Sequence, residues 1–132
     1  MKPYQLKVEK PWGYELILTP SESPVTGKIL HLKAGARFSY QYHEQKQETV
    51  VLIFGQAKLI FEDESGKLQE VEMESQKGYF IKPYVKHRCQ AISDCDIMEA
   101  STPEVGKTVR LEDDYSRPDE TEAERSQARF QK

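Results

Sequence analysis

Three residues with metal-binding side chains, Gln41, His43 and Glu48, lie at the polar centre of the segment GARFSYQYHEQKQETVVLIFG, residues 35–55. An imidazole, a carboxylate and an amide oxygen together form a mixed nitrogen and oxygen ligand set for a divalent cation. A hairpin exposed to solvent requires none of these residue types in particular. The segment therefore predicts a metal site, completed by a fourth ligand from elsewhere in the chain.

Strand periodicity predicts the directions of these side chains. Residues two apart in a strand project from the same face, so Gln41 and His43 point together if 37–44 is a strand. Glu48 begins the next expected strand, whose inward-facing apolar residues should be Val50, Leu52 and Phe54. A carboxylate buried there without a partner would be costly, and a bound cation would remove that cost.

A further histidine, His87, opens another expected strand after a turn that contains Pro83. From that position it could supply the fourth ligand from across a barrel. The predicted ligand set is Gln41, His43, Glu48 and His87. It suits one divalent metal ion. Zn is the first expectation and Mn, Fe or Ni are alternatives, since such a ligand set suits all four metals and their availability often decides which is bound. His31 matches no motif and is interpreted as an ordinary strand histidine.

The elements that must position these residues are short strands with turn residues between them. The expected strands are 14–18, 27–35, 37–44, two within 48–63 that meet near Gly55, 67–74, 79–83, 87–93 and 95–102. We find no convincing amphipathic helix before residue 110. Many short strands at regular spacing predict an all-β sandwich or small barrel.

Length and composition predict one soluble domain. The chain has 132 residues with 31% charged and 37% hydrophobic residues and a net charge of −3, which is ordinary for a globular domain. There is no basic stripe typical of nucleic-acid binding and no cationic cluster for a membrane surface. No apolar run approaches the ~20 residues of a membrane span, and no signal-peptide core begins the chain, so we expect a cytoplasmic protein. Cys89 and Cys95 are expected to be free thiols.

The end of the sequence differs from the rest in being highly charged. Beyond Tyr115, the only large apolar residue is Phe130. We therefore expect a domain over 1–117, followed by a polar C-terminal tail over 118–132 that is either helical or disordered.

The ligand spacing resembles the cupin family. Gly35, Gln41, His43, Glu48 and Gly55 stand at the positions of the first cupin motif, with Gln41 in place of its first His. The resemblance implies a single cupin barrel, a double-stranded β-helix of the jelly-roll kind, closing on a metal pocket.

The second cupin motif is matched less fully. Gly78, Pro83 and His87 fit it, whereas Val85 stands in place of its usual Gly and Ala91 in place of its closing Asn. Val85 lies in the loop before His87 and Ala91 follows it, and both departures leave the expected ligand in place.

One cupin branch is similar to this chain over most of its length, namely the type II mannose-6-phosphate isomerases, which are often fused to a mannose-1-phosphate guanylyltransferase. Its marks here are PWG at 11–13, Gln-x-His at 41–43 and VRLEDDYSR at 109–117. The chain departs from the branch where Lys46 replaces a typical Arg and where Thr49 and Val50 replace His and Trp. Lys offers a compact charge in place of a planar fork.

The resemblance implies aldose–ketose isomerisation of a phosphorylated sugar, in which a base moves a proton between C1 and C2. Glu99, Lys46 and Lys82 are the candidate catalytic residues. Arg110, Arg117 and Lys82 are the candidate contacts of the phosphate.

Other functions remain open at this point. The chain could be another metal-cupin enzyme such as a dioxygenase, or a non-catalytic cupin that binds a sugar or a metal. A nucleotide-sugar epimerase is disfavoured, because such epimerases usually lack the complete metal set. A homodimer is a further expectation, since pairing would cover the exposed edges of a small barrel.

Overall fold

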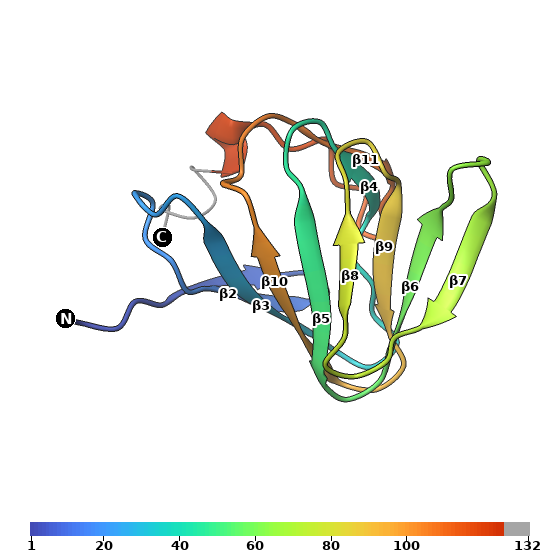
Figure 1. The fold of residues 1–132 in the computed structure, drawn as a ribbon, viewed down its shortest axis with the longest axis horizontal. Coiled ribbons are helices and arrows are strands. Elements are labelled where there is room, and N and C mark those ends of the chain that lie inside the picture. The colour runs from blue at the N-terminus through green and yellow to red at the C-terminus, as the bar shows by residue number, and fades with distance from the viewer. Residues whose placement is uncertain (126–132) are drawn as a thin grey trace.

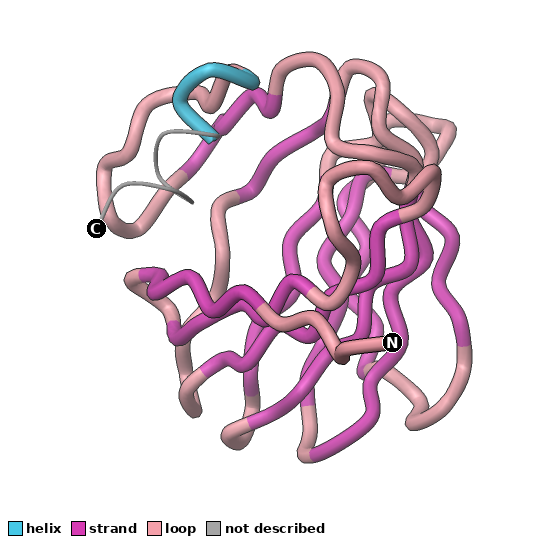
Figure 2. Tube along the Cα trace, turned by 90° about the vertical axis from the view of Figure 1, so that its left-hand side faces the viewer, coloured by secondary structure: helices cyan, strands magenta, loops and turns pink. Residues whose placement is uncertain are grey.

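The computed structural model describes residues 1–125, and strands make up most of its regular structure (Figure 1). The strands are β1 (Leu6–Lys10), β2 (Gly13–Ile17), β3 (Thr26–Leu32), β4 (Tyr40–His43), β5 (Glu48–Phe54), β6 (Ala57–Glu62), β7 (Leu68–Glu72), β8 (Gly78–Ile81), β9 (His87–Ala91), β10 (Cys95–Ser101) and β11 (Thr108–Glu112). A short helical turn at 122–125 follows them and is coloured cyan in Figure 2. The predicted all-β class is confirmed.

The strands form two antiparallel sheets (Figures 1 and 2). The six-stranded sheet has the order β1-β2-β3-β10-β5-β8, and the five-stranded sheet has the order β11-β4-β9-β6-β7. Apolar side chains of both sheets meet in one core, including Leu32 and Ile97 from the first sheet and Leu59 and Cys89 from the second. Cys89 and Cys95 are buried free thiols, as predicted. Among the described residues, no helix is long and apolar enough to span a membrane.

Two strands were missed by the sequence patterns. In β1 only Val8 is buried, because the strand lies at the edge of its sheet. β11 lies in the charged segment that was assigned to no strand, and its pairing with β4 supplies its backbone partners. Glu120 forms a β-bridge with Thr108, so part of the predicted tail packs against β11. The rest of the predicted tail, 126–132, lies outside the described residues.

The inward direction of Phe54 was predicted wrongly. Glu48, Val50 and Leu52 are buried as expected, but Phe54 is 60% exposed. The pairing of β5 with β10 shifts register between Asp96 and Ile97. An irregularity of this kind reverses the face on which the following side chain lies.

Gly55, in the turn between β5 and β6, has a positive φ of 79°. A Cβ added there would overlap with the backbone oxygen of Asp94. Gly66 has a similar φ of 82°, but a Cβ added there would lie 3.9 Å from the nearest atom, Glu62 Oε1. We expect Gly55→Ala to lower the free energy of unfolding by about 3 kcal/mol and Gly66→Ala by about 1 kcal/mol, because only the first adds overlap to backbone strain. Urea unfolding of both variants measures the difference, and equal losses would contradict it.

Candidate metal centre

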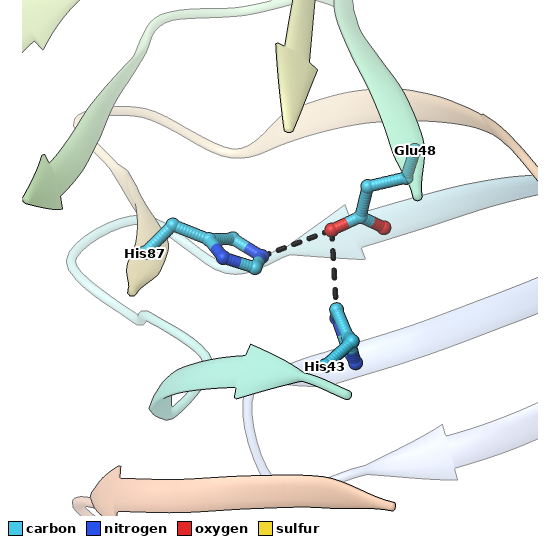
Figure 3. A group of neighbouring side chains, drawn as sticks. All are labelled: His43, Glu48 and His87. Atoms are coloured by element: carbon cyan, nitrogen blue, oxygen red, sulfur yellow. Dashed lines mark ion pairs between the residues drawn. The ribbon is translucent and has the colours of Figure 1, made fainter. Parts of the chain in front are cut away.

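His43, Glu48 and His87 converge from three strands of the two sheets (Figure 3). His43 ends β4, Glu48 begins β5 and His87 begins β9. Glu48 Oε1 lies 2.9 Å from His87 Nε2 and 3.5 Å from His43 Nε2. All three residues are buried, and one ligand atom from each lies within 4.8 Å of the others. The structure thus brings together three of the four residues of the predicted ligand set as one group.

The outer nitrogens of both imidazoles have their own partners. His87 Nδ1 donates to the backbone oxygen of Val85 at 2.8 Å, which leaves the lone pair on Nε2 facing Glu48. His43 Nδ1 lies 3.0 Å from Thr108 Oγ1 on β11. Metal-binding histidines usually use the second nitrogen in this way, since such a bond orients the ring.

Gln41 lies beside the group, on the same face of β4 as His43, as the strand alternation predicted. Its Nε2 is 3.5 Å from His43 Nε2. Its Oε1 accepts a hydrogen bond from Ser39 Oγ at 2.6 Å. The amide oxygen therefore points to Ser39, and rotation of the amide would exchange the positions of oxygen and nitrogen.

The residues present fit a divalent cation. Glu48 Oε2 and His87 Nε2 are buried, and among the described residues neither forms a hydrogen bond of good geometry, although Oε2 lies 3.3 Å from Lys46 Nζ and Nε2 lies 2.9 Å from Glu48 Oε1. With the His87 imidazole neutral, its Nε2 and Glu48 Oε1 would both be acceptors that face each other, and a cation between them would satisfy both. Two imidazoles, a carboxylate and an adjacent amide suit first-row divalent metals.

A buried acid–lysine pair adjoins the candidate ligands. Lys46 Nζ lies 3.3 Å from Glu48 Oε2 and 3.2 Å from Glu99 Oε2. Burial alone would lower the pKa of Lys46, but nearby carboxylates raise it well above its ordinary value. Burial and the adjacent Glu48 carboxylate raise the pKa of Glu99 to about 8. The pKa of Glu48 is lowered well below its ordinary value despite burial, chiefly by Lys46. This pair therefore joins a permanent cation to an acid with a pKa near neutrality.

Two of the three candidate phosphate contacts, Arg110 and Arg117, lie near the candidate ligands, and the third, Lys82, does not. Arg110 and Arg117 line the same cavity as Gln41, His43 and Glu48. Arg110 donates to the backbone oxygen of Pro118 at 2.7 Å, and its Nε has no hydrogen-bond partner among the described residues. Arg117 donates to both carboxylate oxygens of Asp113, at 3.0 and 3.1 Å.

Lys82 is not brought to this cavity. Ile81 ends β8 with its side chain buried in the core, so the following residue, Lys82, points outward and is exposed. It lines a surface pocket beside Phe61 and Tyr84. We therefore leave Lys82 out of the proposed site, both as a base and as a phosphate contact.

Sequence reasoning missed several residues that line the cavity, namely Glu15, Lys28, Glu104, Thr108 and Glu120. One signal was available for Lys28, because it has the same strand parity as Leu30 and Leu32, which are buried in the core. Glu15 offered the same signal, since it shares its strand face with the buried Ile17, whereas no pattern marked Glu104, Thr108 or Glu120.

A pH dependence of stability follows from His43. Burial, reinforced by the Lys46 charge, lowers its pKa from 6.5 to about 4. Between these values the unfolded chain binds more protons than the folded chain, so stability falls as the pH is lowered. We expect the metal-free protein to lose about 3 kcal/mol of unfolding free energy through this group between about pH 7 and 4.

Urea unfolding over this pH range measures the loss. His43→Gln should remove that part of the dependence, while His31→Gln, at a half-exposed position, should keep it. An identical pH profile for the native protein and His43→Gln would contradict the assignment.

Comparison with known proteins agrees with this geometry. The sequence matches the family of mannose-6-phosphate isomerase C-terminal domains over residues 2–118. No curated protein matches the sequence. Among solved structures, a Bacillus subtilis oxalate decarboxylase variant has a TM-score of 0.70 at 18% identity, covering 81% of this chain and 30% of that chain. Lactobacillus farciminis oxalate decarboxylase in its formate complex has a TM-score of 0.70 at 18% identity, covering 83% of this chain and 36% of that chain.

These neighbours are cupin proteins, and at this identity they show the fold alone. This chain spans about a third of their length. One B. subtilis oxalate decarboxylase, with a TM-score of 0.65 at 18% identity, is described for its Mn(II) centres. The match of the family over residues 2–118 covers most of the chain. The chain therefore belongs to the family of mannose-6-phosphate isomerase C-terminal domains and has the cupin fold.

Proposed function

We propose that this chain is a metal-dependent isomerase that interconverts the aldose and ketose forms of a phosphorylated sugar. The observation that supports this most directly is that the candidate ligands Gln41, His43 and Glu48 line the same cavity as the buried Lys46–Glu99 pair. An aldose–ketose interconversion requires a polarised carbonyl and, beside it, a group that moves a proton between adjacent carbons. The family match supports the same reaction class.

The ligands in this proposal are Gln41, His43, Glu48 and His87. When bound, a divalent metal would supply Lewis-acid polarisation of the sugar carbonyl. Glu48 Oε2 forms an ion pair with the Lys46 ammonium, which leaves Oε1 to face the two imidazoles. Lys46 thereby fixes the orientation of the carboxylate.

Glu99 is the proposed general base. Its Oε2 is 3.2 Å from Lys46 Nζ, and its pKa near neutrality suits a group that both takes and returns a proton. It would remove the proton from one carbon of the substrate and return it to the adjacent carbon. Lys46 stabilises Glu99 in its charged form.

The arginines at the rim are the proposed first contacts of the phosphate. Arg110 and Arg117 line the same cavity as Gln41, His43 and Glu48, and guanidinium groups match phosphate oxygens in pairs. The buried Arg110 Nε, which has no hydrogen-bond partner among the described residues, supports this role.

The experiment is a panel of sugar phosphates and free sugars, beginning with mannose 6-phosphate and fructose 6-phosphate. The protein is reconstituted separately with Zn, Mn, Fe and Ni. Turnover of a hexose phosphate that is lost in Gln41→Ala and impaired in Arg110→Ala is the expected result. Thermal stabilisation by a sugar without turnover would instead identify a non-catalytic binding cupin. Oxygen consumption with the iron form would identify a dioxygenase.

A further inference from the structure

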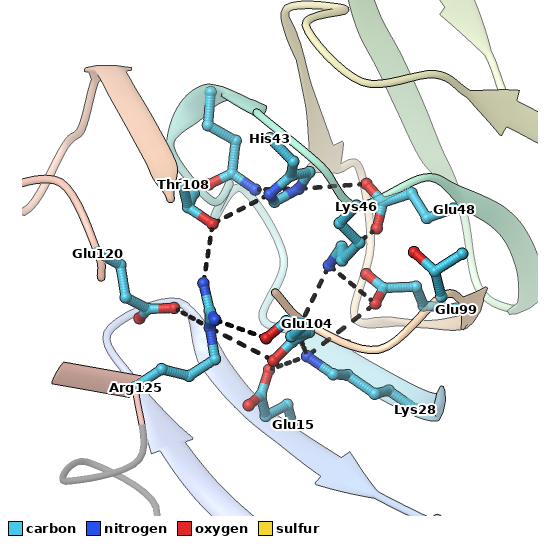
Figure 4. Close-up of polar contacts among 12 residues, drawn as sticks. Glu15, Lys28, His43, Lys46, Glu48, Glu99, Glu104, Thr108, Glu120 and Arg125 are labelled. Atoms are coloured by element: carbon cyan, nitrogen blue, oxygen red, sulfur yellow. Dashed lines mark hydrogen bonds and ion pairs between the residues drawn. The ribbon is translucent and has the colours of Figure 1, made fainter. Parts of the chain in front are cut away.

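Glu104 places a negative charge inside the cavity from a loop. It lies between β10 and β11, and its side chain is 9% exposed. Its carboxylate contacts Lys28 Nζ and lies 3.3 Å from Lys46 Nζ (Figure 4). One loop carboxylate thus binds two buried ammonium groups.

Lys28 and Lys46 come from different elements and reach the same point. Lys28 projects inward from β3, and Lys46 comes from the connection between β4 and β5. Their side chains are 4% and 6% exposed. Two buried cations this close together are costly unless an anion lies between them. Among the described residues, Glu104 and Glu99 each contact both ammonium groups, and Glu104 is the one that comes from a loop.

The other carboxylates near Lys28 belong to the sheet. Glu15 on β2 and Glu99 on β10 lie 3.6 and 4.0 Å from Lys28 Nζ, and the backbone of each strand is fixed by ladder pairing on both sides. The backbone at Glu15 and Glu99 cannot move away from the cavity without opening the six-stranded sheet. Glu104 belongs to no ladder, so its carboxylate can leave while both sheets remain intact.

Side chains of the helical turn at 122–125 hold this loop. Arg125 Nη1 donates to the backbone oxygen of Glu104 at 3.0 Å, and Arg125 Nε lies 3.4 Å from its carboxylate. Glu122 accepts a hydrogen bond from the backbone nitrogen of Gly106 at 2.7 Å. Contacts of this kind can break and re-form locally, unlike the backbone ladders of a sheet.

The cavity in this arrangement is too small for a sugar. Its volume is about 70 Å³, whereas a pocket for a small-molecule ligand has at least about 300 Å³. A substrate therefore requires the cavity to widen. Withdrawal of Glu104 would open space and expose two cations at the same moment.

We propose that Lys28 and Lys46 form an oxyanion subsite for the anionic group of the substrate, and that Glu104 occupies this subsite until the ligand displaces it. The ligand chemistry is a phosphate or carboxylate attached to a sugar. The proposal rests on the proposed function for the choice of phosphate, and it places that group deeper than Arg110 and Arg117. The rim arginines meet the anion first, and the two lysines hold it.

The test measures binding of inorganic phosphate to the Zn²⁺-loaded chain by isothermal titration. Glu104→Gln removes the competing charge while keeping the shape of the side chain, and it should bind phosphate at least about tenfold more tightly than the native chain. Glu74→Gln removes one charge from an exposed site, beside Lys77, and is the matched control. It should leave phosphate affinity unchanged.

A double variant, Lys28→Met with Glu104→Gln, removes one cation and one anion together and so preserves the charge balance of the core. It should lose the tenfold gain while keeping its metal, because the candidate ligands are intact. If the gain persists in the double variant, the phosphate binds the metal and the subsite is wrong. Unchanged or weaker phosphate binding in Glu104→Gln would also overturn the proposal.

Two further measurements complete the design. Gluconate in place of phosphate distinguishes the two sources of the oxyanion, since a sugar-acid site should favour gluconate and a sugar-phosphate site should favour phosphate. Circular dichroism verifies that each variant is folded. Because the readout is anion binding, a failure of isomerase turnover and a failure of this subsite remain distinguishable.

Discussion

His87→Ala is expected to lower the affinity for a divalent metal by more than about 100-fold, since loss of a partner outside the ligand set alone costs about 10- to 100-fold. His87 is 1% exposed, and its Nε2 has no hydrogen-bond partner among the described residues although it faces Glu48 at 2.9 Å. Alanine removes this nitrogen and leaves the Glu48 carboxylate with one imidazole fewer. Metal analysis after dialysis, followed by competition with a chromogenic chelator, measures the loss.

Two variants make this result specific. His31→Ala should retain the metal, because His31 lies on the other face of its sheet, stacked on Tyr14 and 2.6 Å from Asp96. Thr108→Val should lower the metal affinity by an intermediate factor of about 10 to 100. It removes the partner of His43 Nδ1 and leaves the ligands in place. Equal losses in His31→Ala and His87→Ala would show that the centre is assigned wrongly.

Glu99→Gln is expected to lower kcat for the sugar phosphate by about 10²- to 10⁴-fold, the usual contribution of a positioned acid or base. The amide keeps the shape of the side chain and can still accept a hydrogen bond from Lys46, which lies 3.2 Å from Glu99 Oε2. It can neither take nor return a proton. The metal content should remain unchanged, since Glu99 is not in the proposed ligand set.

Lys82→Ala is the control for this result. Lys82 was an equal candidate from sequence, but it lies in a different surface pocket, so its replacement should leave kcat within about twofold. Steady-state kinetics on the first hexose phosphate that turns over measures both variants. Full activity in Glu99→Gln together with a large loss in Lys46→Met would transfer the role of base to Lys46.

How much of this protein the sequence determines is clear from its candidate metal centre. Strand alternation placed Gln41 and His43 on one face and Glu48 inward, and His87 was added from its place after the Pro83 turn, in agreement with the cupin spacing. Each of these predictions depends on neighbours within a few residues or on a linear spacing. The structure brings His43, Glu48 and His87 into one group, with Gln41 beside them.

The rest was decided by tertiary structure. Phe54 faces outward because the pairing of β5 with β10 shifts register. Lys82 lies away from the cavity because it follows Ile81, whose side chain is buried, and therefore points outward. The contacts of Glu104 with Lys28 and Lys46 join residues 76 and 58 positions apart. Local periodicity specifies the face of a strand on which a side chain lies. Only the pairing of distant strands, and the loops that the pairing positions, specify which charges meet inside the cavity.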